Sequence, residues 1–451
     1  MSFARTIGDI PTSLILGPLE KKDLETYYVD TISVRTGSEL KSPIRKIISA
    51  CESPAERNSF LFLGHRGCGK STELNKMAGQ LEEMGHRVIT IPCDSELDRS
   101  NLSYEDLLIL MGDFLLRLAD EKDLYLEPGL VRQIQRFWRW ETVEEETRLT
   151  EAGVDLEAGA SLPAFLNFLK MSVKGSLKYG DSIKTTYRQK IEKKSSEWIR
   201  LLQQVIGQLT ERCNGCQPIL IFEDLDKLEP EVAWRVFYDH YDTLSRLDCP
   251  VIYTFPISLS YDPKFNAFSG YFQHEILPMI KIATPEGNRY EKGYQEIREI
   301  VSRRMDVEAL FEGGLSEDEG TVLNYLISKT GGALRDLFHV ILDCSRMAKW
   351  ANLPKINREL ADISLEEMKS DLTRRIERRN YAFLVSIWKG NHKPIDGKEM
   401  LLEMLQAGVV LEYNGERWQD VHPLVKDFLE ELRTQGQLKK EMEELEALYG
   451  R

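Results

Sequence analysis

The sequence is poor in cysteine and contains no long hydrophobic run. Its seven cysteines, an odd number spread over 451 residues, are too few for a disulfide framework and are typical of free thiols in a reducing compartment. No apolar stretch approaches the roughly 18 residues of a membrane span, and the first residues lead into no signal-peptide core. These absences argue against a membrane-spanning or disulfide-stapled protein, and we expect a cytoplasmic one.

Positive charge is also scarce, because 59 basic residues face 73 acidic ones and give a net charge of −14 at pH 7. This balance argues against a protein that coats nucleic acid with its whole surface, since such proteins are basic over the binding domain. The seven histidines show no metal-ligand spacing, and there is no nucleophile elbow or nuclease-like cluster. Cys213 and Cys216 form a lone C-x-x-C, which we interpret as part of a loop rather than a zinc or redox site.

What is present is the composition of a globular chain, 42% hydrophobic and 29% charged, with a length that suggests about two to four domains. Short apolar runs predict buried strands at 60–63, 87–92, 219–226, 251–255 and 276–282. A helical pattern runs from Ser103 to Ala119, with Asp106 completing a capping box. Strands that alternate with helices predict an α/β fold with a parallel sheet.

One motif is complete. Residues 64–71, GHRGCGKS, satisfy G-x-x-x-x-G-K-[ST] and follow the strand predicted at 60–63. The three glycines permit backbone angles closed to other residues, so that successive N–H groups form a nest for phosphate oxygens, and the following helix adds its positive end. The predicted binding residues are Gly64, His65, Arg66, Gly67, Cys68, Gly69, Lys70, Ser71 and Thr72.

Two side chains of this P-loop have predicted roles. Lys70 reaches the β- and γ-phosphates, and the Ser71 hydroxyl completes a Mg²⁺ shell, whereas Thr72 lies one position too late for the metal. The alternative is a chance glycine turn. The strand before the motif and the amphipathic helix after it favour a site for a nucleoside triphosphate.

The strand predicted at 219–226 ends in carboxylates. Beside the P-loop, Glu223 is predicted to hold Mg²⁺ and Asp224 to polarise the attacking water. The alternative is a buried strand followed by a solvated acidic turn. Thr254, near the end of the next strand, either hydrogen-bonds the same water or is an ordinary strand residue.

The segment of about 121–214 is too long for a crossover, and we interpret it as an insertion. Alternation over 169–179 predicts a half-exposed strand, and helical spacing from Tyr187 to Leu209 predicts a long helix. Over 170–200 nine basic residues outnumber three acidic ones and make either a solvated face or a surface for nucleic acid or a partner. The basic residues are Lys170, Lys174, Lys178, Lys184, Arg188, Lys190, Lys193, Lys194 and Arg200.

After residue 286 the pattern becomes helical and predicts a lid. Arg335 follows the Gly331-Gly332 turn, in the first turn of a helix, where its guanidinium either reaches a γ-phosphate or lies on the surface. Further on, helices at 372–388 and 399–405 precede a hairpin of 409–413 and 417–421 around Asn414-Gly415. Helices followed by a hairpin suggest a winged helix.

The arginines that begin this winged-helix-like part either meet phosphates or lie on a solvated face: Arg374, Arg375, Arg378 and Arg379. The tail repeats Leu438, Met442, Leu445 and Leu448 at helical steps, which predicts a packing helix. The predicted organisation is an N-terminal approach segment at 1–46, a P-loop domain at 47–285, a helical lid at 286–360, a winged-helix-like domain at 361–435 and a C-terminal helix at 436–451.

Together these features resemble the AAA+ and STAND group of P-loop ATPases, and their order is most similar to bacterial relatives of the origin-recognition-complex branch. The resemblance implies an ATP site with Mg²⁺ in which residues 64–71 correspond to Walker A and Glu223 with Asp224 to Walker B. It likewise implies that Thr254 is sensor one and Arg335 sensor two. ATP rather than GTP is implied by the resemblance alone, as is an effector partner in bacterial regulation or defence.

Two features depart from the family pattern. The usual Walker B order is aspartate then glutamate, and here Glu223 precedes Asp224, which changes side-chain reach at both positions. No arginine occurs from 251 to 288, where a trans-acting finger is sought. Arg303 and Arg304 on the lid helix are either substitutes for it or ordinary surface residues. Oligomerisation therefore stays open.

Three functional hypotheses follow. The first is a Mg²⁺-dependent ATPase that couples nucleotide state to movement of the lid and winged helix and to a macromolecular partner. The second is a switch that binds ATP but hydrolyses it slowly or not at all, which the swapped acidic pair supports. The third is a DNA loader or remodelling factor that uses the winged helix and the 170–200 patch.

Overall fold

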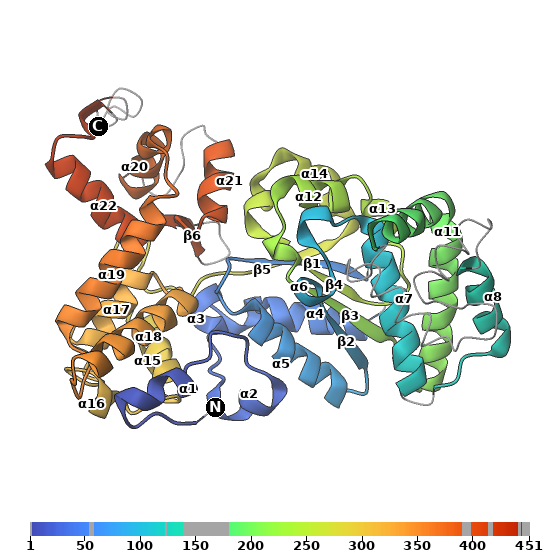
Figure 1. Cartoon of the computed structure of the whole chain (residues 1–451), viewed down its shortest axis with the longest axis horizontal. Helices are drawn as coiled ribbons and strands as arrows, with labels where there is room; N and C mark the ends of the chain where they lie inside the picture. The colour runs from blue at the N-terminus through green and yellow to red at the C-terminus, as the bar shows by residue number, and fades with distance from the viewer. Residues whose placement is uncertain are drawn as a thin grey trace.

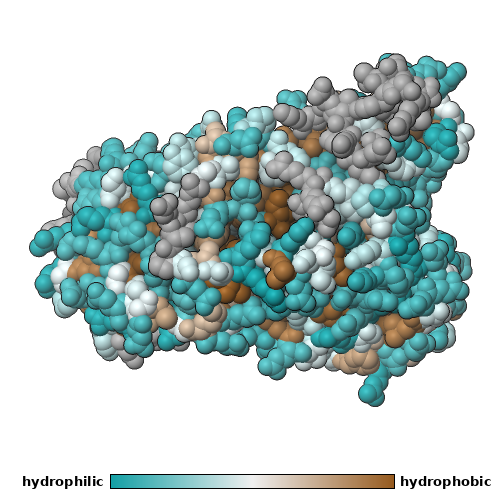
Figure 2. All heavy atoms as spheres, turned by 180° about the vertical axis from the view of Figure 1, so that it is seen from behind, coloured by the Kyte–Doolittle hydropathy of each residue, from teal (hydrophilic) through white to brown (hydrophobic). Residues whose placement is uncertain are grey.

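The computed structural model of the chain describes residues 2–53, 58–121, 124–138, 180–389, 398–413, 418–440 and 443. The strand expected at 169–179, the turn at Asn414-Gly415 and the tail positions Met442, Leu445 and Leu448 lie outside these residues. Within the described residues, no helix is both long enough and apolar enough to cross a membrane. Hydrophilic residues cover most of the described surface seen from behind (Figure 2).

A five-stranded parallel sheet forms the centre of the molecule, with the strand order β2-β3-β4-β1-β5 (Figure 1). Its strands are β1 (Ser59–Gly64), β2 (Arg87–Pro92), β3 (Pro218–Glu223), β4 (Val251–Pro256) and β5 (Gln273–Leu277). All five predicted strands are therefore confirmed, although β5 lies earlier than the predicted 276–282. β5 ends before Pro278, which has no N–H for a sheet ladder.

Helices cover both faces of the sheet. On one face lie α4 (Pro43–Glu52) and α5 (Lys70–Glu83), and on the other α7 (Tyr104–Glu121), α8 (Pro128–Trp138) and α11 (Gly180–Arg212). The β-strands in the middle are buried on both sides, as their continuous apolar sequences predict. The long helix predicted from Tyr187 to Leu209 is confirmed within α11.

Trp198 of α11 packs directly over Gly112 of α7. A Cβ on Gly112 would lie 2.4 Å from Trp198 Cζ2, while the indole Nε1 donates to Leu108 O at 3.0 Å. We expect Gly112→Ala to lower the free energy of unfolding by about 1–3 kcal/mol, because a rigid buried ring must move. Gly207→Ala on α11 is the matched control, with no atom near its added Cβ, and is expected to be neutral or stabilising. Urea unfolding checks both; equal stabilities would contradict the packing.

The lid consists of α15 (Glu291–Ser302), α16 (Val307–Leu310), α17 (Val322–Thr330) and α18 (Leu334–Trp350). The N-terminal segment, with α1 (Ile10–Ser13), α2 (Lys21–Tyr27) and α3 (Ile32–Thr36), joins it through a bridge between Ala4 and Met305. Figure 1 shows α1 and α2 beside the lid and below α5. The segment therefore connects the lid with the P-loop helix.

The winged-helix-like part contains α19 (Arg358–Thr373), α20 (Tyr381–Lys389), α21 (Lys398–Gln406), β6 (Val410–Tyr413), β7 (Trp418–Val421) and α22 (Pro423–Thr434). The antiparallel β6-β7 pair confirms the predicted hairpin. The single helix predicted at 372–388 is wrong, because α19 ends at Thr373 and α20 begins at Tyr381. Hydrogen bonds there shift to i→i−3 pairs such as Arg375 N to Leu372 O, the tightening found at helix ends.

Candidate functional site: a P-loop nucleotide cavity

The P-loop lies between β1 and α5, as its sequence predicts. Gly67 and Gly69 have φ angles of 80° and 104°, in the left-handed region that favours glycine. Gly64 is needed for a different reason, because a Cβ there would lie 2.8 Å from the backbone oxygen of Leu277. Two of the three predicted glycine roles are thus conformational, and the third is close packing against β5.

Lys70 is buried at the start of α5, and its ammonium has three close partners. Nζ donates to Gly64 O and His65 O, each at 2.8 Å, and pairs with Asp226 Oδ2 at 2.8 Å. Both charged side chains are less than a tenth exposed. Sequence analysis did not assign a role to Asp226; the available signal was a third acid after the two that end β3.

Glu223 and Ser71 contact each other, where Mg²⁺ is expected. The Ser71 hydroxyl hydrogen-bonds the Glu223 carboxylate, whose pKa is raised to about 7 by burial and by Asp224 and Asp226, while Oε1 is buried without a hydrogen-bond partner. No group of three or more His, Cys, Asp or Glu in the described part of the chain is arranged to hold a metal. The Ser71 hydroxyl and the Glu223 carboxylate nevertheless fit Mg²⁺, because Mg²⁺ takes one or two carboxylates and fills its other positions with phosphate and water.

Asp224 lies at the end of β3 with a φ of 70°, which is rare for a residue other than glycine. Its Oδ1 pairs with Lys227 Nζ at 2.7 Å, and the same Nζ pairs with Asp94 Oδ2 at 2.5 Å. The predicted water-polarising carboxylate is therefore held by a lysine that a second acid shares. Sequence analysis missed Lys227 and Asp94, because Asp94 lies far away in the chain, just after β2.

Thr254 is buried in β4 and connects two strands. Its hydroxyl donates to Phe222 O at 3.1 Å and accepts from Leu225 N at 3.0 Å. These bonds fix the carboxyl end of β3, which carries Glu223 and Asp224. Contact of Thr254 with a catalytic water stays a prediction.

Arg335 lies in the first turn of α18, directly over the P-loop. A Cβ on Gly67 would lie 2.7 Å from Arg335 Cβ, and Arg335 Nε would be 3.5 Å away. The guanidinium has no hydrogen bond or ion pair with any described residue, and it lines the nucleotide cavity. This placement brings the predicted sensor two to the P-loop.

A cavity of about 380 Å³ extends from the P-loop to the lid and the N-terminal segment. Its apolar end is lined by Ile15, Leu16, Pro18, Val29, Ile300 and Phe338. Thr72, predicted to bind nucleotide, accepts a hydrogen bond from Leu19 N at 3.2 Å and so holds this segment to α5. The cavity is thus lined by polar residues of the P-loop and β3 and by apolar residues of the N-terminal segment and the lid.

The two lid arginines proposed as trans-acting substitutes are both engaged within this chain. Arg304 is 4% exposed, lines the nucleotide cavity and donates from Nη1 to Ile300 O at 2.6 Å. Burial lowers its pKa to about 10. Arg303 pairs with Glu299 and donates to Tyr28 O. Arg304 is therefore not a surface residue that could reach a neighbouring subunit.

His65 joins the P-loop to the winged-helix-like part. Its Nε2 accepts a hydrogen bond from the backbone N–H of Glu412 in β6 at 2.8 Å. Met279 N donates to Glu412 O at 3.1 Å, and Tyr413 pairs with Met279 as an isolated parallel bridge. The hairpin, a separate two-stranded sheet, is therefore bonded to the segment that follows β5 and touches the phosphate loop directly.

Two buried histidines at this junction predict acid sensitivity. Burial lowers the pKa of both His65 and His422 to about 3, with smaller contributions from Lys70 and Lys426 respectively. In the unfolded chain their pKa is about 6.5. Between pH 6.5 and pH 3 the two imidazoles are therefore protonated in the unfolded chain but not in the folded chain. The stabilisation is complete above about pH 6.5 and is lost as the pH falls from there toward 3.

His422→Asn tests this effect, because asparagine can also cap α22, as the His422 Nδ1 does for Leu424 N. Between pH 7 and pH 5 we expect the free energy of unfolding to fall by about 2 kcal/mol less in the variant than in the wild type. Denaturant titrations at the two pH values measure this. An identical fall in both proteins would contradict the assignment.

Two basic residues of the 170–200 patch have a buried acidic partner inside the chain. Lys184 and Arg188 both pair with Asp106, which is wholly buried in α7. Lys170, Lys174 and Lys178 lie outside the described residues. The four winged-helix arginines also have internal partners: Arg374 pairs with Asp371, Arg375 with Ala407 O, Arg378 with Gln437 O and Arg379 with Glu403.

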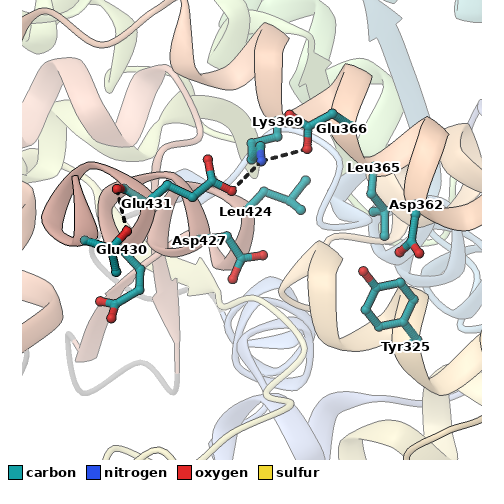
Figure 3. A pocket seen from close by; sticks show the side chains of 10 residues that line it. Tyr325, Asp362, Leu365, Glu366, Lys369, Leu424, Asp427, Glu430 and Glu431 are labelled. Atoms are coloured by element: carbon teal, nitrogen blue, oxygen red, sulfur yellow. Dashed lines mark hydrogen bonds and ion pairs between the residues drawn. The ribbon is translucent and has the colours of Figure 1, made fainter.

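A second cavity, of about 490 Å³, lies between α17, α19 and α22 and is shown in Figure 3. Lys369 bridges Glu366 and Glu431 there, at 2.7 and 2.8 Å. Asp362, Asp427 and Glu430 add further carboxylates. These three carboxylates also have basic partners: Asp362 pairs with Arg358, Asp427 with Lys329 and Glu430 with Arg433.

The strand order, the P-loop and the lid define the class: this chain has a P-loop α/β fold with a five-stranded parallel sheet, followed by a helical lid and a winged-helix-like part. Solved structures similar to it include a Walker-type ATPase of Pyrococcus abyssi, at 14% identity with 93% of this chain and 99% of that chain covered and a TM-score of 0.44. Cdc6p from Pyrobaculum aerophilum is 13% identical, with 93% of this chain and 98% of that chain covered and a TM-score of 0.35. The ORC1 protein of Aeropyrum pernix, solved in complex with DNA, is 12% identical, with 87% of this chain and 92% of that chain covered and a TM-score of 0.34. No protein-family model and no curated protein matches the sequence.

Proposed function

We propose that the protein is a Mg²⁺-dependent ATPase that relays its nucleotide state through the lid and the winged-helix-like domain to a macromolecular partner. The polar and apolar ends of the 380 Å³ cavity support nucleotide binding. The resemblance supports adenine as the base and a cytoplasmic role in bacterial regulation or defence. The same resemblance supports an effector protein as the partner.

The observation that carries the relay is the hydrogen bond from Glu412 N to His65 Nε2. A residue of the phosphate loop is thereby bonded to the hairpin of another part of the chain. On the other side, Tyr413 Oη donates to Gly331 O at 2.7 Å, at the turn that precedes Arg335. The hairpin thus contacts both elements that would touch phosphate, and a movement of either one displaces it.

The placement of the side chains supports the following proposed roles in hydrolysis. Water attacks the γ-phosphorus, a new P–O bond forms, the bond to the β–γ bridging oxygen breaks, and ADP and phosphate leave. Asp224 orients the water, Lys70 and Arg335 stabilise the charge on the phosphoryl oxygens, and Ser71 with Glu223 would hold Mg²⁺. The metal would supply charge neutralisation at the phosphates.

A second function, a slow or non-hydrolysing switch, is favoured by one specific contact. Lys227 neutralises Asp224 and is itself held by Asp94. While Asp224 Oδ1 is bonded to Lys227 Nζ, that oxygen is not available to orient a water. If this network persists with ATP bound, binding alone would carry the signal.

The DNA-loader hypothesis has less support. α21, the helix that precedes the hairpin, packs against residues 257–261 of the P-loop domain and carries Glu399 and Glu403. DNA binding by this helix would require the winged-helix-like part to leave the P-loop. A salt-dependent affinity for double-stranded DNA would support it, and its absence would exclude it.

Phosphate release under excess Mg-ATP tests the proposal, with the wild type beside Asp224→Asn and Lys227→Met. The hydrolase hypothesis predicts turnover that Asp224→Asn reduces at least about 100-fold. The switch hypothesis predicts ATP binding with no release above that of Asp224→Asn, and an increase when Lys227→Met frees the carboxylate. ATP binding that is absent altogether would contradict both hypotheses.

A further inference from the structure

We propose that Asp226 is a built-in competitor of the nucleotide, a carboxylate that takes the phosphate's place at Lys70 and must be displaced before a nucleotide binds. The inference rests on the proposed function, because it assumes that Lys70 binds phosphate. It adds a residue that limits the affinity of the site.

The donors of Lys70 are fully used. An ammonium group has three N–H donors, and here they have three acceptors: Gly64 O, His65 O and Asp226 Oδ2, each at 2.8 Å. The two carbonyl groups belong to the backbone of the P-loop and cannot leave without unfolding it. Asp226 is the side chain that can rotate away. A phosphate oxygen can therefore accept a hydrogen bond from Lys70 only when the bond to Asp226 is broken.

The displacement is costly because the pair is buried. The side chains of Lys70 and Asp226 are 6% and 8% exposed, and Glu223 and Asp224 already lie nearby. A phosphate that entered without displacing Asp226 would meet a third carboxylate in a site of low dielectric. The free energy of nucleotide binding to the wild type therefore includes the cost of breaking this ion pair. An uncharged residue at position 226 removes that cost.

The structure provides a place for the displaced carboxylate. Asp226, Arg66 and Arg335 line both the nucleotide cavity and a separate cavity of about 480 Å³. This 480 Å³ cavity extends to Leu405 and Gly408, beside the hairpin of the winged-helix-like part. Rotation of Asp226 into it would take the carboxylate out of the nucleotide cavity and move its negative charge toward the hairpin.

Isothermal titration calorimetry with Mg²⁺ and either ADP or a non-hydrolysable ATP analogue tests the inference. We expect Asp226→Asn, which keeps the size and a hydrogen-bond acceptor, to bind both nucleotides at least tenfold more tightly than the wild type, and Asp226→Glu, which keeps the charge, to stay within about threefold. Asp242→Asn is the matched control, since it removes the same charge from an exposed residue. It should bind like the wild type.

Thermal unfolding without nucleotide shows whether Asp226→Asn is folded. If it is not, Asp226→Ser removes the same charge, and the same gain is expected from it. Unchanged or weaker binding by a folded, uncharged variant would overturn the inference while leaving nucleotide binding intact. If Lys70→Ala binds as well as the wild type, or if the wild type does not bind, the proposed function itself fails.

Discussion

Replacing Lys70 with alanine is expected to lower ATP affinity by at least about 100-fold and to abolish phosphate release, because the site loses its only buried ammonium among the described P-loop residues. The same change should lower the free energy of unfolding by about 3–5 kcal/mol, because it leaves the buried Asp226 without its charge partner. Calorimetry and urea unfolding measure the two effects separately.

The double variant Lys70→Ala with Asp226→Asn separates binding from folding. It carries no unpaired buried carboxylate at this position, so most of the lost stability should return while ATP affinity stays low. Lys76→Ala on the same helix is the control, since Lys76 is partly exposed and pairs with Asp30 at 3.2 Å. Full ATP affinity in the stable double variant would show that Lys70 does not bind phosphate.

Gly67→Ala is expected to weaken ATP binding by at least about 30-fold, which corresponds to roughly 2 kcal/mol. Two causes act together. A φ of 80° is strained for alanine, and the new methyl group would lie 2.7 Å from Arg335 Cβ, so that α18 must move off the phosphate loop. The substitution therefore damages the phosphate nest and the placement of Arg335 at once.

Nucleotide titration, together with limited proteolysis of the lid, measures these effects. Gly79→Ala on α5, the helix that follows the P-loop, is the control, because an added Cβ there meets no atom within 4 Å and its backbone is helical. It should bind ATP like the wild type. If Gly67→Ala also binds like the wild type, the contact between Gly67 and Arg335 has no functional weight.

The fold was largely predictable because its signals are local. The P-loop motif, the apolar strands and the hairpin are each specified by a few adjacent residues. The helix predicted at 372–388 was wrong because the apolar positions Leu372 and Ile376 stay in phase across the break at Thr373. Periodicity identifies a helical face but does not locate a turn between two helices that share it.

The details of the site were less predictable because they depend on contacts between distant residues. His65 and Glu412 are 347 positions apart, and Lys227 meets Asp94 across 133 positions. Nor does sequence show which of three neighbouring acids faces Lys70, since the left-handed backbone of Asp224 redirects the chain after β3. Asp106, with which Arg188 and Lys184 both pair, could not be identified from the sequence for the same reason.

Hydrogen–deuterium exchange of residues 410–413 tests the central claim, the relay from the P-loop to the hairpin, most directly. The amide of Glu412 donates to His65, so its exchange reports the bond itself. We predict that this segment exchanges at least tenfold faster with a non-hydrolysable ATP analogue than with ADP, because only the ATP analogue has a γ-phosphate to attract Arg335, and the hairpin is bonded to the turn that precedes Arg335. α8, on the far side of the sheet, should not change and is the internal control. Equal exchange at residues 410–413 in the two nucleotide states, with both nucleotides bound, would contradict the account.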